Sequence, residues 1–348
     1  MRRVIHRPDF PLAQTQEGVL RGFQDDEVYT FYGIRYGRAK RFQRAEPERP
    51  WEGIRDAKAF GYVCPLMPEK HDPEDPMSLP NAAFEMPHRF WPESEDCLFL
   101  NVWTKHLDRT AKKPVFVWLH GGGYGTGSSI EIPSYDGHNL ADYGDVVVVT
   151  LNHRLNCLGF LDLSSFGDKY RESGINGMTD IVLALKWVRR NIAAFGGDPD
   201  NVTVAGQSGG GGKAVALLQM PEADGLYRRL ISESGAFHER AGETIESNKE
   251  RWQKLGRKTA EVLGLTSKNI DQIDEIPYEK LALAAEKAGN ELHMPVGMIL
   301  FEPSVTEGVY TGPYHLAGFR EETKEVPVIA GTVFAEFALG HAMGDREA

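Results

Sequence analysis

A serine flanked by glycines points most directly to chemistry in this sequence. Residues 206–210 read Gly-Gln-Ser-Gly-Gly, a G-x-S-x-G pattern centred on Ser208. In a nucleophile elbow of this kind, a strand turns sharply into a helix, and the turn exposes the serine hydroxyl above the sheet. The β-branched residues of 201–204 predict the strand, and the apolar stretch 211–220 predicts the helix. Ser208 is therefore a candidate nucleophile for acyl transfer.

A second glycine-rich motif lies upstream of the elbow. Residues 115–119 form an apolar run of strand length, and residues 120–123 read His-Gly-Gly-Gly. Glycines allow a backbone N–H to reach a substrate oxyanion because no Cβ stands in the way. Gly122, Gly123 and Gly209 are the candidate oxyanion-hole donors. A flexible glycine turn is the alternative interpretation of the upstream motif alone, and the elbow that follows it favours the catalytic one.

Further segments along the chain accompany these two motifs in a familiar order. Together they resemble the type-B carboxylesterases of the α/β-hydrolase fold, a family that includes bacterial para-nitrobenzyl esterases and, more distantly, the cholinesterases. The resemblance extends from residue 18 to about residue 337 and rests mainly on segments 18–22, 31–36, 95–102, 146–161, 184–204 and 234–236. One departure is Gly209, where the family usually has alanine; glycine keeps the N–H and is expected to loosen the turn.

The resemblance also implies the partners of the nucleophile. The acid of the family's triad follows a strand that ends in Gly-Thr, and Glu336 stands at the matching place after residues 326–332. Ser234 matches a hydroxyl that lies beside this acid, so we expect it to support Glu336 through a hydrogen bond rather than to act as a nucleophile.

The triad histidine is expected on a loop after one more strand, beyond residue 348. The chain therefore looks truncated at its C-terminus, without the last strand and the catalytic-histidine loop, and we expect it to be nearly inactive toward simple esters. Neither His153, His238 nor His341 fits the position of the base. His120 is expected to order the glycine loop, which we define as residues 120–123, rather than to accept a proton.

Three functions remain open from the sequence. The first is a serine carboxylester hydrolase that acts on small carboxylic esters through an acyl-enzyme intermediate. The second is a catalytically impaired or non-catalytic binding relative, because no triad histidine is evident. The third is a thioesterase or amidase that uses the same site, since the nucleophile and the oxyanion hole serve every acyl transfer.

The pattern of apolar residues predicts an α/β fold with a mostly parallel central sheet, antiparallel N-terminal strands and a helical cap. Strands separated by helices favour parallel pairing. We expect one domain over residues 1–348, with cap or regulatory helices at about 240–320. The expected core strands are 98–104, 114–119, 145–151, 201–205 and 327–331; edge strands are expected within 18–37, a helix at 177–194 and a surface loop at 62–95.

Composition limits the class of partner. The formal charge of −11 and the pI near 5.5 disfavour nucleic acid. No apolar run reaches the length of a membrane span and no signal peptide is evident, so we expect no membrane partner and a cytoplasmic location. A small-molecule ester is the expected ligand, with no metal and no cofactor. The oligomeric state is not predicted. Cys64 and Cys97 match a disulfide of secreted family members, but free thiols are expected in a cytosolic chain.

Overall fold

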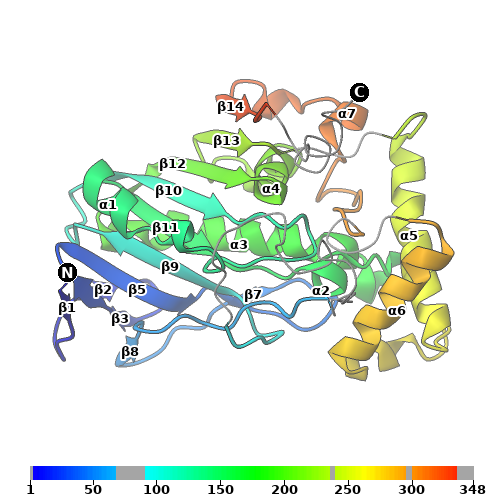
Figure 1. Ribbon diagram of the computed structural model, residues 1–348, viewed down its shortest axis with the longest axis horizontal. Coiled ribbons are helices and arrows are strands. Elements are labelled where there is room, and N and C mark those ends of the chain that lie inside the picture. Colours follow the sequence, from blue (N-terminus) through cyan, green and yellow to red (C-terminus); the bar gives the residue numbers. More distant parts are fainter. Residues whose placement is uncertain (1–2, 68–90, 236–239, 295–299, 335–348) are drawn as a thin grey trace, which may run out of the picture.

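The chain folds around a large mixed β-sheet (Figure 1). The computed structural model describes residues 3–67, 91–235, 240–294 and 300–334. Its main sheet has nine strands in the order β1-β4-β5-β9-β11-β10-β12-β13-β14. The strands of this sheet are β1 (Val4–Ile5), β4 (Phe23–Asp25), β5 (Val28–Arg35), β9 (Phe99–Thr104), β10 (Lys113–Leu119), β11 (Val147–Leu151), β12 (Gly197–Gln207), β13 (Arg229–Glu233) and β14 (Val328–Gly331).

Two small sheets accompany the main one. The first has the order β2-β3-β8 and the second pairs β6 with β7. Their strands are β2 (Leu12–Gln14), β3 (Val19–Arg21), β8 (Ile54–Asp56), β6 (Gly37–Arg38) and β7 (Glu46–Pro47). Strands are present within the predicted range 18–37, but most of them are not edge strands. β3 lies between β2 and β8, and β4 and β5 each have a neighbouring strand on both sides in the main sheet. The predicted loop at 62–95 lies mostly outside the described residues, because 68–90 are not among them.

The direction of the strands divides the main sheet into two halves. From β11 through β10, β12 and β13 to β14, every neighbouring pair is parallel, as the alternation of strands and helices predicts. The strands from β1 to β9 pair antiparallel, and β9 is also antiparallel to β11. The reason for the direction of β9 is its connection to β10: residues 105–112 contain no helix that could carry the chain back for a parallel crossover.

Helices cover both faces of the parallel half. In β11, Val148 packs with Trp103 and with Ala141 of α1 (His138–Gly144) on one face. Its neighbours Val147 and Val149 point to the other face, as alternation along a strand requires, and join the main core. On that face lie α3 (Asn176–Asn191) and α4 (Gly209–Leu217). The predicted helix at 177–194 is therefore confirmed.

The centre of the parallel half is fully buried. Val117 of β10 lies opposite Val204 of β12, and neither side chain is exposed to solvent. Burial of side chains of this size stabilises the fold by roughly 1.5–3 kcal/mol each. Two residues further along the same register, Leu119 lies opposite Gly206, so the ends of β10 and β12 meet at the position where the two glycine motifs begin.

Of the remaining α-helices in the described ranges, three lie within 240–320, where cap or regulatory helices are expected, and one lies earlier in the chain. They are α2 (Asn156–Phe160), α5 (Ile245–Val262), α6 (Tyr278–Glu291) and α7 (Tyr314–Ala317). A capping box starts α5, in which the Thr244 hydroxyl accepts the Ser247 N–H and the Ser247 hydroxyl accepts the Thr244 N–H. α5 and α6 pack against each other near α2, at one end of the molecule (Figure 1). None of the helices in the described ranges has the length and apolarity to cross a membrane.

Candidate active site

The predicted elbow is present at Ser208. β12 ends at Gln207, α4 begins at Gly209, and Ser208 between them has φ 54° and ψ −124°. A non-glycine residue in this region carries strain of roughly 1–3 kcal/mol, so its surroundings must hold it. The Ser208 N–H donates to the Glu233 carbonyl at 2.8 Å, and the Ser208 carbonyl accepts the Gly212 N–H at 3.0 Å. The half-buried serine therefore stands at the carboxyl end of β12, fixed by β13 and α4.

The glycines around Ser208 are required by close backbone contacts. A Cβ on Gly210 would lie 2.1 Å from the Leu119 carbonyl oxygen, and one on Gly206 would lie 2.4 Å from the Gly210 carbonyl carbon. Both distances are far below any van der Waals contact. The turn can therefore form only because these two positions lack side chains.

The loop that follows β10 lies beside the elbow. A Cβ on Gly121 would lie 3.6 Å from the Ser208 Cβ. Gly122 and Gly123 both have positive φ, 81° and 59°, and residues with a side chain rarely adopt such values. The sequence-predicted candidates Ser208, Gly122, Gly123 and Gly209 thus come together at one corner of the sheet, where β10 and β12 end.

Three successive carbonyls of the loop, those of residues 120–122, have hydrogen-bond partners. The His120 carbonyl accepts from the Lys213 ammonium at 3.1 Å and the Gly121 carbonyl from His120 Nδ1 at 2.9 Å. The Gly122 carbonyl accepts from the Thr126 N–H at 3.0 Å. Because the C=O and N–H of a trans peptide point in opposite directions, these contacts also set the directions of the N–H groups that follow each carbonyl.

Gly209 makes the closest contact between the elbow and the loop. A Cβ at this position would lie 2.3 Å from the Gly123 carbonyl oxygen and 2.5 Å from the Gly123 nitrogen. The missing side chain therefore lets the loop approach the first turn of α4, and the expectation that glycine loosens the turn stays a prediction. An alanine, the usual residue of the family, would push Gly123 away.

Three polar side chains, those of Lys213, His120 and His153, are buried beneath the glycine loop. Lys213 of α4 has no solvent exposure, and His120 and His153 are 1% and 0% exposed, with rings stacked at 5.1 Å. Burial lowers the pKa of Lys213 to about 7, although the Glu131 carboxylate opposes the shift. Burial, followed by the Lys213 charge, holds the pKa of both histidines well below its usual range.

These two histidines are poorly suited to act as a base. Nδ1 of His120 contacts the Gly121 carbonyl, and Nδ1 of His153 contacts the Arg154 carbonyl at 2.8 Å. Since a carbonyl only accepts, both Nδ1 atoms carry the proton. His120 thus holds the loop in the way the sequence predicts. Within the described residues, no side chain hydrogen-bonds to the Ser208 hydroxyl.

The acid side of the site is described only in part. Ser234 follows β13 at the carboxyl edge of the sheet with φ 49°, and its N–H donates to the Gly331 carbonyl of β14 at 2.7 Å. Glu336, His238 and His341 lie outside the described residues. The hydrogen bond between Ser234 and Glu336 therefore stays a prediction.

The sequence analysis missed Lys213 entirely. The signal was present, since Lys213 is the one charged residue in the apolar stretch 211–220 that predicts the helix. A lysine in such a stretch usually reaches the surface, because a buried charge is costly, and only the structure shows that this one turns inward.

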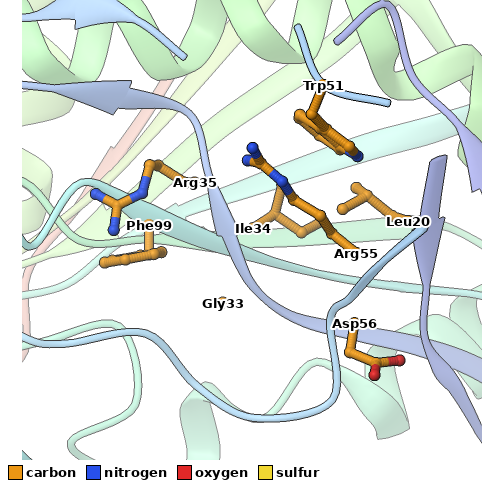
Figure 2. A pocket seen from close by; sticks show the side chains of 8 residues that line it. All are labelled: Leu20, Gly33, Ile34, Arg35, Trp51, Arg55, Asp56 and Phe99. Atoms are coloured by element: carbon orange, nitrogen blue, oxygen red, sulfur yellow. The ribbon is translucent and has the colours of Figure 1, made fainter. Parts of the chain in front are cut away.

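A separate cavity of about 180 Å³ lies between β3, β5, β8 and β9, which are far from the elbow in the sequence (Figure 2). Arg35 lies 4.3 Å from the Phe99 ring centre, and Arg55 lies 4.2 Å from that of Trp51. Both guanidinium groups pair with carboxylates, including Glu48 at 3.8 and 3.2 Å. None of the predicted site residues lines this cavity, so it is not part of the candidate active site.

One group of side chains has the spacing of metal ligands. The candidate ligand atoms of Asp25, Asp26 and His138 lie within 4.8 Å of one another, at β4 and the start of α1. His138 Nε2 also contacts the Asp25 backbone carbonyl at 3.1 Å, which accounts for its orientation. Acidic groups of this kind are common at protein surfaces without a metal ion. The three residues also lie on other elements than the elbow at Ser208, so they are not part of the candidate active site.

Known proteins share both the sequence and the architecture of this chain. The model of the carboxylesterase family matches residues 9–348. A para-nitrobenzyl esterase of Bacillus subtilis (strain 168) is 37% identical over 326 residues, which are 92% of this chain and 62% of that protein. The phenmedipham hydrolase of Pseudarthrobacter oxydans is 38% identical over 275 residues, 78% of this chain and 51% of that protein.

Solved structures agree with these relatives. An esterase of Clostridium hathewayi, described as able to hydrolyse aliphatic aromatic polyesters, superimposes with a TM-score of 0.83 at 43% identity. The match covers 97% of this chain and 65% of that one, so the chain spans less than two thirds of the length of these relatives. The strained serine at the end of β12, the glycine loop beside it and the matches along the chain have one common explanation: the chain belongs to the carboxylesterase family, with the α/β-hydrolase fold.

Proposed function

We propose that this chain carries the nucleophile and the oxyanion hole of a serine carboxylester hydrolase. The observation that supports the proposal most strongly is the strained backbone of Ser208 beside the glycine loop, with a Cβ on Gly121 only 3.6 Å from that of Ser208. Strain at such a position costs stability, and its use here would be to present the hydroxyl to a substrate carbonyl.

In the proposed reaction, Ser208 Oγ attacks the ester carbonyl carbon and its proton passes to a general base. The tetrahedral oxyanion accepts hydrogen bonds from the backbone N–H groups of Gly122, Gly123 and Gly209. Collapse of this intermediate releases the alcohol, which takes the proton, and leaves an acyl-enzyme. Water then attacks the acyl carbon, and the carboxylic acid and Ser208 are released.

The base is a histidine by the family resemblance, and Glu336 would orient it with support from Ser234. His120 and His153 are unsuited to this role, because burial and the Lys213 charge hold them neutral beneath the loop with their Nδ1 atoms bound to carbonyls. The oxyanion donors do not depend on the base, since they belong to the described glycine motifs.

We propose small carboxylic esters as the substrate class. The names of the relatives support this choice, because they include a para-nitrobenzyl esterase and an esterase that hydrolyses aliphatic aromatic polyesters. A thioesterase or amidase activity at the same site is the second candidate, since its tetrahedral intermediate would use the same donors.

The test is a comparison of wild-type protein with Ser208→Ala on p-nitrophenyl acetate, a matched thioester and a matched anilide. In a protein with a complete triad, Ser208→Ala should lower kcat by about 10⁴-fold while the circular dichroism spectrum is unchanged. Activity of the variant within tenfold of the wild type would refute the nucleophile. Faster turnover of the thioester or anilide than of the ester would replace the proposed substrate class.

A further inference from the structure

Lys213 is a buried cation for which the proposed ester hydrolysis has no direct use. Its side chain is completely buried on α4, one and a half turns after the nucleophile. Burying a lysine costs far more than burying an apolar residue of the same length, even when the group gives up its proton. A methionine or leucine would fill this space at lower cost, so the amine must make a contact that those side chains cannot make.

That contact is with the first peptide of the glycine loop. Lys213 Nζ donates to the His120 carbonyl oxygen at 3.1 Å and also lies 5.9 Å from the ring centre of Tyr124, at the far side of the loop. The same carbonyl packs against the first turn of α4, because a Cβ on Gly210 would lie 2.9 Å from it. The amine thus ties the loop to the helix that starts at Ser208.

We propose that Lys213 is a positioning residue for the oxyanion hole, which holds the His120 carbonyl and thereby fixes the direction of the glycine loop relative to Ser208. The loop has no side chains of its own between residues 121 and 123, so it depends on partners of its carbonyls. Lys213 holds the first, the His120 ring holds the second and Thr126 holds the third.

The consequence is a coupling between the two halves of the oxyanion hole. Gly209 lies at the start of α4 and Gly123 lies in the loop, where their backbones touch. Lys213 adds a second connection one turn deeper. With both connections present, the N–H groups of the loop and of α4 keep a fixed distance from one another. An oxyanion between them can then lie about 2.7–3.1 Å from each donor.

The experiment combines a measurement of the loop itself with kinetics, because the inference rests on the proposed function. Lys213→Met keeps the length of the side chain and removes the donor; Lys213→Gln keeps a neutral donor. Leu185→Ala, a fully buried position on α3, is the control for loss of stability without loss of the contact. Hydrogen–deuterium exchange of the peptide that spans residues 119–126 reports on the loop without any turnover.

Lys213→Met should accelerate exchange in this peptide by about tenfold or more. It should lower kcat for p-nitrophenyl acetate by about 10- to 100-fold, change KM by less than about threefold, and weaken a trifluoromethyl ketone inhibitor in parallel with kcat. Lys213→Gln should show smaller losses of the same kind, and it replaces the methionine variant if that one does not fold.

Two results would overturn the inference. One is exchange and kcat within twofold of the wild type in both lysine variants. The other is the same acceleration of exchange in Leu185→Ala at an equal loss of melting temperature, which would make Lys213 merely structural. If a protein with a complete triad hydrolyses no ester, the proposed function fails, but the exchange data still decide whether Lys213 holds the loop.

Discussion

The ends of β10 and β12 and the edge strand β14 belong to the parallel half of the main sheet but differ sharply in packing. At the ends of β10 and β12, glycines touch backbone: Cβ atoms on Gly209 and Gly210 would lie 2.3 and 2.1 Å from carbonyl oxygens. On β14, Val328 and Ile329 are 41% and 67% exposed, and a Cβ on Gly331 would meet none of the described residues within 4 Å.

The difference shows where the geometry of the site comes from. Ser208, the proposed nucleophile, and the proposed oxyanion donors are fixed by backbone contacts that β10, β12 and α4 make among themselves. The proposed triad acid, Glu336, follows β14 and lies outside the described residues. Substitutions should therefore be severe at the tight corner and mild along the open strand.

The largest effect is expected from Gly209→Ala. The added methyl group would collide with the Gly123 backbone, so the loop must move and the Gly123 N–H leaves its place. Loss of one oxyanion donor typically lowers kcat by about 10²- to 10³-fold. Steady-state hydrolysis of p-nitrophenyl acetate in an active protein measures this loss.

The matched control is Gly331→Ala, the same substitution on the open side. Gly331 ends β14 without positive φ, and no described residue lies where its Cβ would strike it. Its kcat should stay within about twofold of the wild type. Equal losses in the two variants would show that the contact between Gly209 and Gly123 is not what limits the site.

A smaller effect is expected in the pH dependence of stability. The pKa of Lys213 falls from 10.5 in the unfolded chain to about 7 in the folded one, so the unfolded state binds more protons between these values. The folded state is therefore penalised fully below pH 7, and the penalty declines as pH rises toward 10.5. Glu131, His120 and His153 are the titratable groups whose charges act on Lys213 or respond to it.

Urea unfolding at several pH values measures this penalty. Between pH 7 and pH 9, wild-type stability should rise relative to that of Lys213→Met by about 2 kcal/mol. Lys186→Met is the control, because Lys186 is only half-buried on α3 and pairs with Glu222. A constant difference between wild type and Lys213→Met across this range would mean that the lysine is not buried as described.

The smallest effect is expected from Ile329→Ala on β14. Because Ile329 is 67% exposed, its truncation should change the free energy of unfolding by no more than about 0.5 kcal/mol. The comparison variant, Val204→Ala, lies in the fully buried centre of β12 and should lose about 2 kcal/mol. Chemical denaturation of both variants checks the contrast; a loss at Ile329 as large as that at Val204 would contradict the open edge.

Local patterns were enough to predict much of the fold. The apolar stripe of α3 predicts a helix because Ile181, Leu185 and Val188 recur at helical spacing, and all three are buried. The strand before Ser208 follows from β-branched residues, and the elbow itself follows from glycines at fixed offsets. These signals lie within a few residues of one another, so no tertiary information is needed to interpret them.

Features that depend on distant partners could not be predicted. The place of β9 between β5 and β11 depends on strands that are far apart in the sequence. The close approach of Gly209 to Gly123, 86 residues earlier, cannot be inferred from the residues around Gly209. Lys213 was missed for the same reason, since its partner is the carbonyl of His120 on another element.

The most direct test of the central claim is to trap the nucleophile. Purified wild-type protein is treated with a fluorophosphonate, and the modified residue is located by peptide mass spectrometry; Ser208→Ala and Ser234→Ala are treated in parallel. The account predicts a single adduct on Ser208 in the wild type and in Ser234→Ala, and none in Ser208→Ala. An adduct on another residue would contradict this expectation. So would loss of ester hydrolysis on treatment with the fluorophosphonate while Ser208 stays unmodified.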